Sequence, residues 1–102
     1  MIITLKKARD FKNVYERGKI AASPLLVLYS LENNMNINRY GFSISKKVGN
    51  AVTRNKIRRC LKELIKSHEE TGYDFVIVVR TRAGNISRRK LFCELRESLG
   101  YK

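Results

Sequence analysis

The chain has 102 residues and a formal net charge of +13, from 22 Lys and Arg against 9 Asp and Glu. Hydrophobic residues make up 43% of the sequence, which favours one folded domain with a modest core and excludes a disordered basic tail. Because so large a charge imbalance destabilises the folded state on its own, we expect a polyanionic partner such as a nucleic acid.

Four other classes of protein are disfavoured. No segment approaches the about 20 apolar residues of a membrane span, so we expect a cytoplasmic protein without membrane contact. A membrane-surface protein would need a free apolar helix face, and the apolar faces here are needed for the core.

Cys60 and Cys93 both fall at apolar helical positions, which favours buried free thiols over a disulfide. His68 is the only histidine and no Cys-x-x-Cys pair exists, so we expect no metal site.

Residues 5–17 place apolar side chains at helical spacing and predict a first helix. Thr4 is a candidate for its N-cap, and Gly18 is a stop signal. Phe11 and Tyr15 are i,i+4 neighbours, so they stand on one face of this helix. The two rings belong either to the core or to a ligand-binding surface, and the spacing alone favours the core.

Three strands are predicted next. Residues 19–22 form a short edge strand before a proline, and residues 25–31 form a strand that is apolar on both faces. After an asparagine-rich loop, residues 39–45 alternate between large apolar side chains and small or polar ones. The small face of this strand either allows the close approach of a ligand or is exposed to solvent.

A long helix over residues 52–68 dominates the second half of the sequence, with Asn50 or Thr53 as its N-cap. Its apolar residues share one arc: Ile57, Cys60, Leu61, Leu64 and Ile65. The adjoining arc, here called the basic stripe, carries five cations, one amide and no acid: Arg54, Asn55, Arg58, Arg59, Lys62 and Lys66. Because like charges at i,i+4 destabilise a helix unless a polyanion neutralises them, the stripe favours a nucleic-acid surface over a solvated face.

The last predicted strand spans residues 73–80, and its continuous apolar run predicts a central position in the sheet. A last helix follows, with Ser87 as a candidate cap and Gly100 as its end. The order of elements is therefore helix, three strands, helix, strand, helix, which indicates a small single-domain α+β sandwich. The strands before and after the long helix are candidates for parallel neighbours.

The sequence holds no constellation suited to catalysis by the protein. Glu69 and Glu70 are the only adjacent acids, and neighbours on a helix diverge, so no acid cluster suits two-metal cleavage of a phosphodiester. No glycine-rich phosphate loop, nucleophile elbow or histidine-based acid–base pair is present. These absences favour a binding protein over a nuclease.

The segment around the start of the long helix resembles the signature of the bacterial ribonuclease P protein subunit. The matching residues are Ser45-Lys46-Lys47-Val48-Gly49-Asn50-Ala51-Val52 and Arg54-Asn55-Lys56-Ile57-Arg58-Arg59. The resemblance covers nearly the whole chain and includes Asp10-Phe11-x-x-Val14-Tyr15 and Leu26-Val27-Leu28-Tyr29. One departure is Lys56, where the family usually has Arg, so the charge is kept and the bidentate guanidinium geometry is lost.

The resemblance implies membership of an RNA-based endoribonuclease that removes the 5′ leader of precursor tRNA. Its RNA subunit performs the hydrolysis with bound Mg²⁺, and the protein binds that RNA and the leader. The implied protein has no cofactor of its own, is monomeric when alone, and forms a single RNA-binding domain over residues 1–102. Its implied fold has the order αβββαβα and a left-handed βαβ crossover, like the second domain of ribosomal protein S5.

The resemblance also assigns residues to sites. The implied RNA-binding set is Lys46, Lys47, Asn50, Arg54, Asn55, Lys56, Arg58, Arg59 and Lys62, with the loop that includes Gly49 facing the catalytic RNA. The implied leader cleft consists of Phe11, Tyr15 and Tyr29, with Arg54, Asn55, Arg58, Arg59 and Lys62 alongside. The alternative from another class is a ribosome-associated or general single-strand RNA-binding protein without a catalytic partner, which identification of the bound RNA would distinguish.

Overall fold

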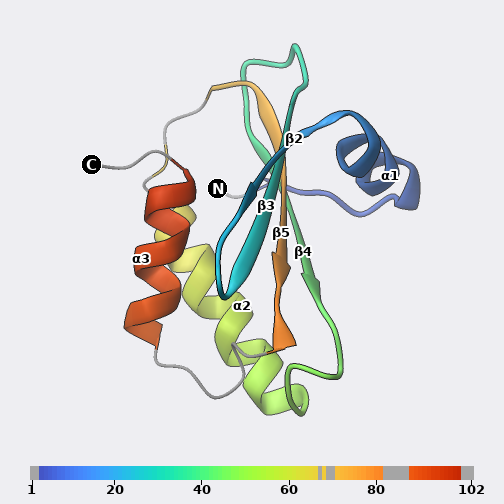
Figure 1. Cartoon of the computed structure of the whole chain (residues 1–102). Helices are drawn as coiled ribbons and strands as arrows, with labels where there is room; N and C mark the ends of the chain where they lie inside the picture. Colours follow the sequence, from blue (N-terminus) through green and yellow to red (C-terminus); the bar gives the residue numbers. More distant parts are fainter. Residues whose placement is uncertain (1–2, 67, 69–70, 82–87, 100–102) are drawn as a thin grey trace.

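One mixed sheet of five strands organises the fold, in the order β1-β4-β5-β3-β2 (Figure 1). The computed structural model describes residues 3–66, 68, 71–81 and 88–99. The strands are β1 (Ile3–Thr4), β2 (Lys19–Ala22), β3 (Leu26–Glu32), β4 (Arg39–Ile44) and β5 (Tyr73–Val79). The helices are α1 (Ala8–Arg17), α2 (Ala51–Ile65) and α3 (Arg88–Ser98).

Strand β5 lies at the centre of the sheet, as its continuous apolar run predicted. It pairs antiparallel with β3 and parallel with β4, and α2 connects β4 to β5. The predicted parallel pairing across the long helix is therefore confirmed, and so is the α+β class.

Helices cover both faces of this sheet. Figure 1 shows α2 and α3 on one face and α1 alone on the other. The larger core lies under α2 and α3, where Leu61, Ile77 and Leu95 are fully buried. The smaller core lies under α1 and consists of Leu5, Val14 and Val76. Neighbouring residues of β5 thus enter different cores, which explains why the strand is apolar on both sides.

The first helix is shorter than its periodicity predicted. It begins at Ala8, and its N-cap residue Lys7 makes no capping hydrogen bond through its side chain. Thr4 is not the cap, because it belongs to the unpredicted strand β1, which pairs parallel with β4. The Leu5 amide continues that pairing by donating to the Tyr40 carbonyl at 2.8 Å. Main-chain bonds to the sheet thus outweigh the helical pattern of the first residues.

Helix α2 confirms one of its two predicted caps. The Asn50 side chain accepts a hydrogen bond from the Thr53 amide at 2.9 Å, which satisfies a free amide of the first turn. The helix ends at Ile65, three residues before the predicted end at His68. The predicted cap Ser87 and the stop residue Gly100 lie outside the described residues.

The two cysteines differ in burial. Both are free thiols, but only Cys60 is buried, whereas Cys93 is exposed. The prediction of burial at Cys93 is wrong because α3 buries Leu91 and Leu95 on one face and presents Cys93 on another. In the described part of the chain, no helix has the length and apolar character needed to cross a membrane.

Candidate nucleic-acid interface

Four neighbouring residues of the basic stripe line an open hollow of about 280 Å³ on the surface of α2: Asn55, Arg58, Arg59 and Lys62. They share one arc of the helix because they are spaced three or four residues apart, close to one helical turn. The Arg58 Nη1 atom donates to the Asn55 Oδ1 atom at 2.9 Å, which fixes the guanidinium group on the helix surface. No acid is among the lining residues, so the hollow concentrates positive charge.

Contacts at the two ends of the stripe orient its other cations. At the start of α2, the Arg54 Nε atom donates to the Gly49 carbonyl at 3.2 Å. Beyond the hollow, the Lys66 ammonium group pairs with the Glu63 carboxylate at 3.2 Å, although Glu63 lies off the predicted arc. One of the five cations therefore has an acidic partner, and the stripe is free of acid only over its first part.

The loop before α2 presents two lysines to solvent. Val48 is buried in the larger core, whereas Lys46 and Lys47 before it are exposed. Gly49 packs against the first turn of α2, because a Cβ atom there would lie 2.9 Å from the Thr53 side chain. The loop is therefore anchored, and its lysines stand at the entrance to the helix. Lys56 is also exposed but does not line the hollow.

The three predicted cleft aromatics meet on the other face of the sheet. The ring of Tyr15 stands edge-on to that of Tyr29, with centroids 4.9 Å apart and an interplanar angle of 87°. Phe11 lies on the same side of α1, with its centroid 6.4 Å from that of Tyr15. Phe11 and Tyr29 pack partly against the smaller core, whereas Tyr15 is 36% exposed. Two of the rings are therefore partly in the core and Tyr15 lies at the surface, whereas ligand binding by any of the three stays a prediction.

The small face of β4 accommodates an aromatic ring of the protein itself. A Cβ atom at Gly41 would lie 2.6 Å from the Cζ atom of Phe11. Gly41 is buried, so this position is neither exposed to solvent nor open to a ligand. The absence of a side chain at Gly41 is what allows α1 to approach the sheet.

The structure brings the predicted residues together as two separate sets. The aromatic rings form one set around α1, and the lining residues of α2 form the other. The two helices lie on opposite faces of the sheet (Figure 1). The resemblance places both sets along one groove, and contact of a single RNA strand with both stays a prediction.

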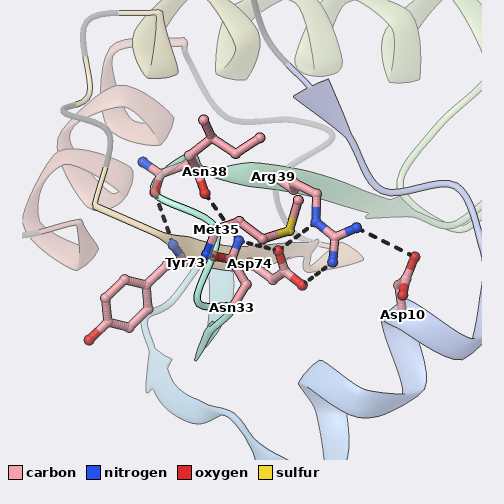
Figure 2. A network of polar contacts seen from close by, with 8 residues as sticks. Asp10, Asn33, Met35, Asn38, Arg39, Tyr73 and Asp74 are labelled. Atoms are coloured by element: carbon pink, nitrogen blue, oxygen red, sulfur yellow. Dashed lines mark hydrogen bonds and ion pairs between the residues drawn. The ribbon is translucent and has the colours of Figure 1, made fainter.

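A polar network beneath α1 was not predicted from the sequence. Figure 2 shows the Arg39 guanidinium group between two carboxylates: its Nε and Nη2 atoms donate to Asp74 at 2.8 and 2.7 Å. Its Nη1 atom lies 3.9 Å from the Asp10 carboxylate of α1. The hydrogen bond to Asp74 raises the pKa of Arg39, and the charges of Asp74 and Asp10 add to this effect.

A signal for this network was present in the sequence. Asp74 stands inside the apolar run of β5, and its side chain is only 8% exposed. A carboxylate so nearly buried requires a partner. Asn33, in the loop after β3, supplies a further hydrogen bond of 2.8 Å to the same carboxylate.

Among the described residues, no three His, Cys, Asp or Glu side chains lie together as ligands for a metal ion. The carboxylates that do converge on Arg39 are already engaged by its guanidinium group.

Comparison with known proteins places this geometry in a family. The family model described as Ribonuclease P matches residues 3–101. The ribonuclease P protein component of Natranaerobius thermophilus is 44% identical over 92 residues, which cover 87% of this chain and 80% of that protein. That of Desulforamulus reducens is 52% identical over 81 residues, or 76% of this chain and 72% of the relative.

A solved structure supports the same assignment. The ribonuclease P protein of Staphylococcus aureus superposes with a TM-score of 0.89 at 32% identity, over 97% of this chain and 94% of that one. The match of sequence and the match of fold both extend over almost the whole chain. The chain therefore belongs to the family of ribonuclease P protein components.

Proposed function

We propose that this protein binds the catalytic RNA subunit of ribonuclease P and the 5′ leader of precursor tRNA, and so assists removal of the leader by that RNA. The observation that carries the proposal is the hollow on α2, which is lined by three cations and an amide and by no acid. Family membership supports the choice of the ribonuclease P RNA as the partner of this surface.

The three cations that line the hollow bind phosphates in this proposal. Arg58 and Arg59 offer planar groups that match phosphate oxygens, and Lys62 adds a compact charge. Each neutralised phosphate releases condensed counterions, so the affinity falls as the salt concentration rises. The exposed lysines of the loop, Lys46 and Lys47, extend this surface at the start of the helix.

The aromatic set binds unpaired bases of the leader. Base–aromatic stacking stabilises a complex by about 1–3 kcal/mol per base and tolerates any sequence, because every base has a π-face. An enzyme that serves many precursor tRNAs needs that tolerance. Tyr15, the most exposed of the three rings, is the stacking platform, and Tyr29 supports it edge-on.

The hydrolysis belongs to the RNA subunit, which supplies the Mg²⁺ chemistry. The described protein residues offer no cluster of three ligands for such an ion. The protein therefore contributes affinity and position, through charge on α2 and stacking at α1.

A reconstitution experiment tests this division of labour. Precursor tRNA is incubated with Mg²⁺ and with the protein alone, the RNA subunit alone, or both. We expect no cleavage by the protein alone and faster leader removal by both together than by the RNA alone. Cleavage by RNA-free protein would refute the proposal. Copurification with ribosomal RNA, and no acceleration of the RNA subunit, would favour the general RNA-binding alternative.

A further inference from the structure

Arg39 is held rigidly on the face of the sheet that α1 covers. The parallel register places it opposite Asp74, to which it donates two hydrogen bonds. Asp74 is itself fixed by the hydrogen bond from Asn33. A guanidinium group constrained in this way loses little further conformational entropy when it attracts another charge.

The charge that Arg39 attracts lies at the start of α1. Asp10 is the acid in the first turn of this helix, and its Oδ2 atom is 3.9 Å from Arg39, with side chains that are 21% and 25% exposed. The helix has no capping hydrogen bond from its N-cap side chain. The ion pair to Arg39 is therefore a polar contact that ties the beginning of α1 to the sheet (Figure 2).

Two successive residues of α1 meet two successive positions on one face of β4. Asp10 meets Arg39, and Phe11 lies over Gly41, two residues farther along the strand. Further along the helix, Tyr15 meets Tyr29 on β3. Because a helix is a rigid element, a shift or rotation at Asp10 carries the aromatic rings with it.

We propose that Asp10 and Arg39 are positioning residues for the leader, because their ion pair sets the orientation in which α1 presents Tyr15 to an unpaired base. This inference rests on the proposed function of the aromatic set. It predicts that loss of the pair selectively weakens binding of RNA that carries a leader and leaves the fold intact.

The test compares two variants of one helix in the reconstituted holoenzyme. Asp10→Asn removes the pair to Arg39, and Glu16→Gln removes the Lys12–Glu16 pair, which also spans 3.9 Å but lies within α1 with side chains 74% and 60% exposed. Each variant removes one negative charge, so any gain in RNA affinity that comes from net charge alone is the same for both variants. The affinities for precursor and mature tRNA are measured at a temperature at which thermal melts show every variant folded.

We expect Asp10→Asn to lower the precursor-to-mature affinity ratio by about two- to fivefold, the range of a partly exposed ion pair. Glu16→Gln should leave the ratio unchanged, and Asp10→Glu, which keeps the charge, should recover most of it. An equal ratio for Asp10→Asn and Glu16→Gln would overturn the inference.

A fourth variant separates failure of the inference from failure of the proposed function. Tyr15→Ala removes the platform itself. If Tyr15→Ala lowers the ratio and Asp10→Asn does not, the leader site stands and the positioning role falls. If Tyr15→Ala leaves the ratio unchanged, the leader site and the positioning role fall together.

Discussion

Gly41 shows how one missing side chain determines the position of a functional helix. From the sequence, the small face of its strand was compatible with a ligand or with solvent. The structure fills that space with the ring of Phe11 from α1. Both alternatives are therefore wrong at Gly41, and the residue pattern could not identify Phe11, because it comes from a segment 30 residues away in the sequence.

A methyl group at Gly41 should therefore displace Phe11. In Gly41→Ala the new Cβ atom would lie 2.6 and 2.7 Å from two carbon atoms of the ring, which forces the ring or the helix to move. We expect the free energy of unfolding to fall by about 1–3 kcal/mol, the usual cost of overpacking. Denaturant unfolding measures it, with Ser43→Ala on the same face of β4 as the control. Equal stability of Gly41→Ala and the unmutated protein would show that Phe11 does not occupy this position in solution.

The partners within the network around Arg39 were out of reach of sequence reasoning for a different reason. Asp10, Arg39 and Asp74 come from three separate elements, and only Asp74, an acid inside the apolar run of β5, is unusual at its own position. Their association depends on the parallel register of β4 with β5 and on α1 crossing the sheet. Since the pKa of Arg39 is raised, the stability that comes from its charged form is lost as the pH rises through this raised pKa, and titration of Arg39 introduces no pH dependence near neutrality.

At the scale of elements, periodicity and capping predicted most of the fold. The alternation of β4, the apolar run of β5 and the Asn50 cap of α2 all follow from local sequence. Strand β1 was missed because its two residues form through pairing with β4, and two residues carry no period. Cys93 was misplaced because a helix that covers a sheet buries only one stripe, and the sequence of α3 does not fix its rotation.

The cations that line the hollow on α2 should act through phosphate charge. We expect Arg58→Ala and Lys62→Ala each to weaken binding to the RNA subunit and to lower the slope of log K against log salt by about 0.7–0.9 per lost phosphate contact. Lys66→Ala is the matched control on the same helix, because Lys66 is already paired with Glu63 and does not line the hollow. Affinities measured over a series of salt concentrations give the slopes. Weaker binding with an unchanged slope would indicate misfolding or base recognition at Arg58 or Lys62.

At the scale of the whole molecule, the sheet lies between the two proposed binding surfaces. The aromatic set belongs to α1 and β3 on one face, and the hollow belongs to α2 on the other (Figure 1). Substitutions at distant sites without shared partners usually add in free energy, whereas residues that act on one constrained ligand show coupling. The resemblance to the family implies one groove, so the coupling between the two surfaces is a measurable property of the proposed complex.

A double-mutant cycle of Tyr15→Ala and Arg58→Ala in the holoenzyme measures that coupling. Tyr15→Ala should cost about 1–3 kcal/mol of affinity for precursor tRNA and leave mature tRNA nearly unaffected, because stacking needs the leader. Because Arg58→Ala weakens assembly of the protein with the RNA subunit, the affinities of all variants for precursor tRNA are compared at protein concentrations that saturate the RNA subunit. We then expect the two losses to add within about 0.5 kcal/mol. A larger interaction energy would show that one RNA strand contacts both surfaces. A fall of about 3–5 kcal/mol in the stability of Tyr15→Ala, with an unchanged precursor-to-mature ratio, would instead assign the ring to the core.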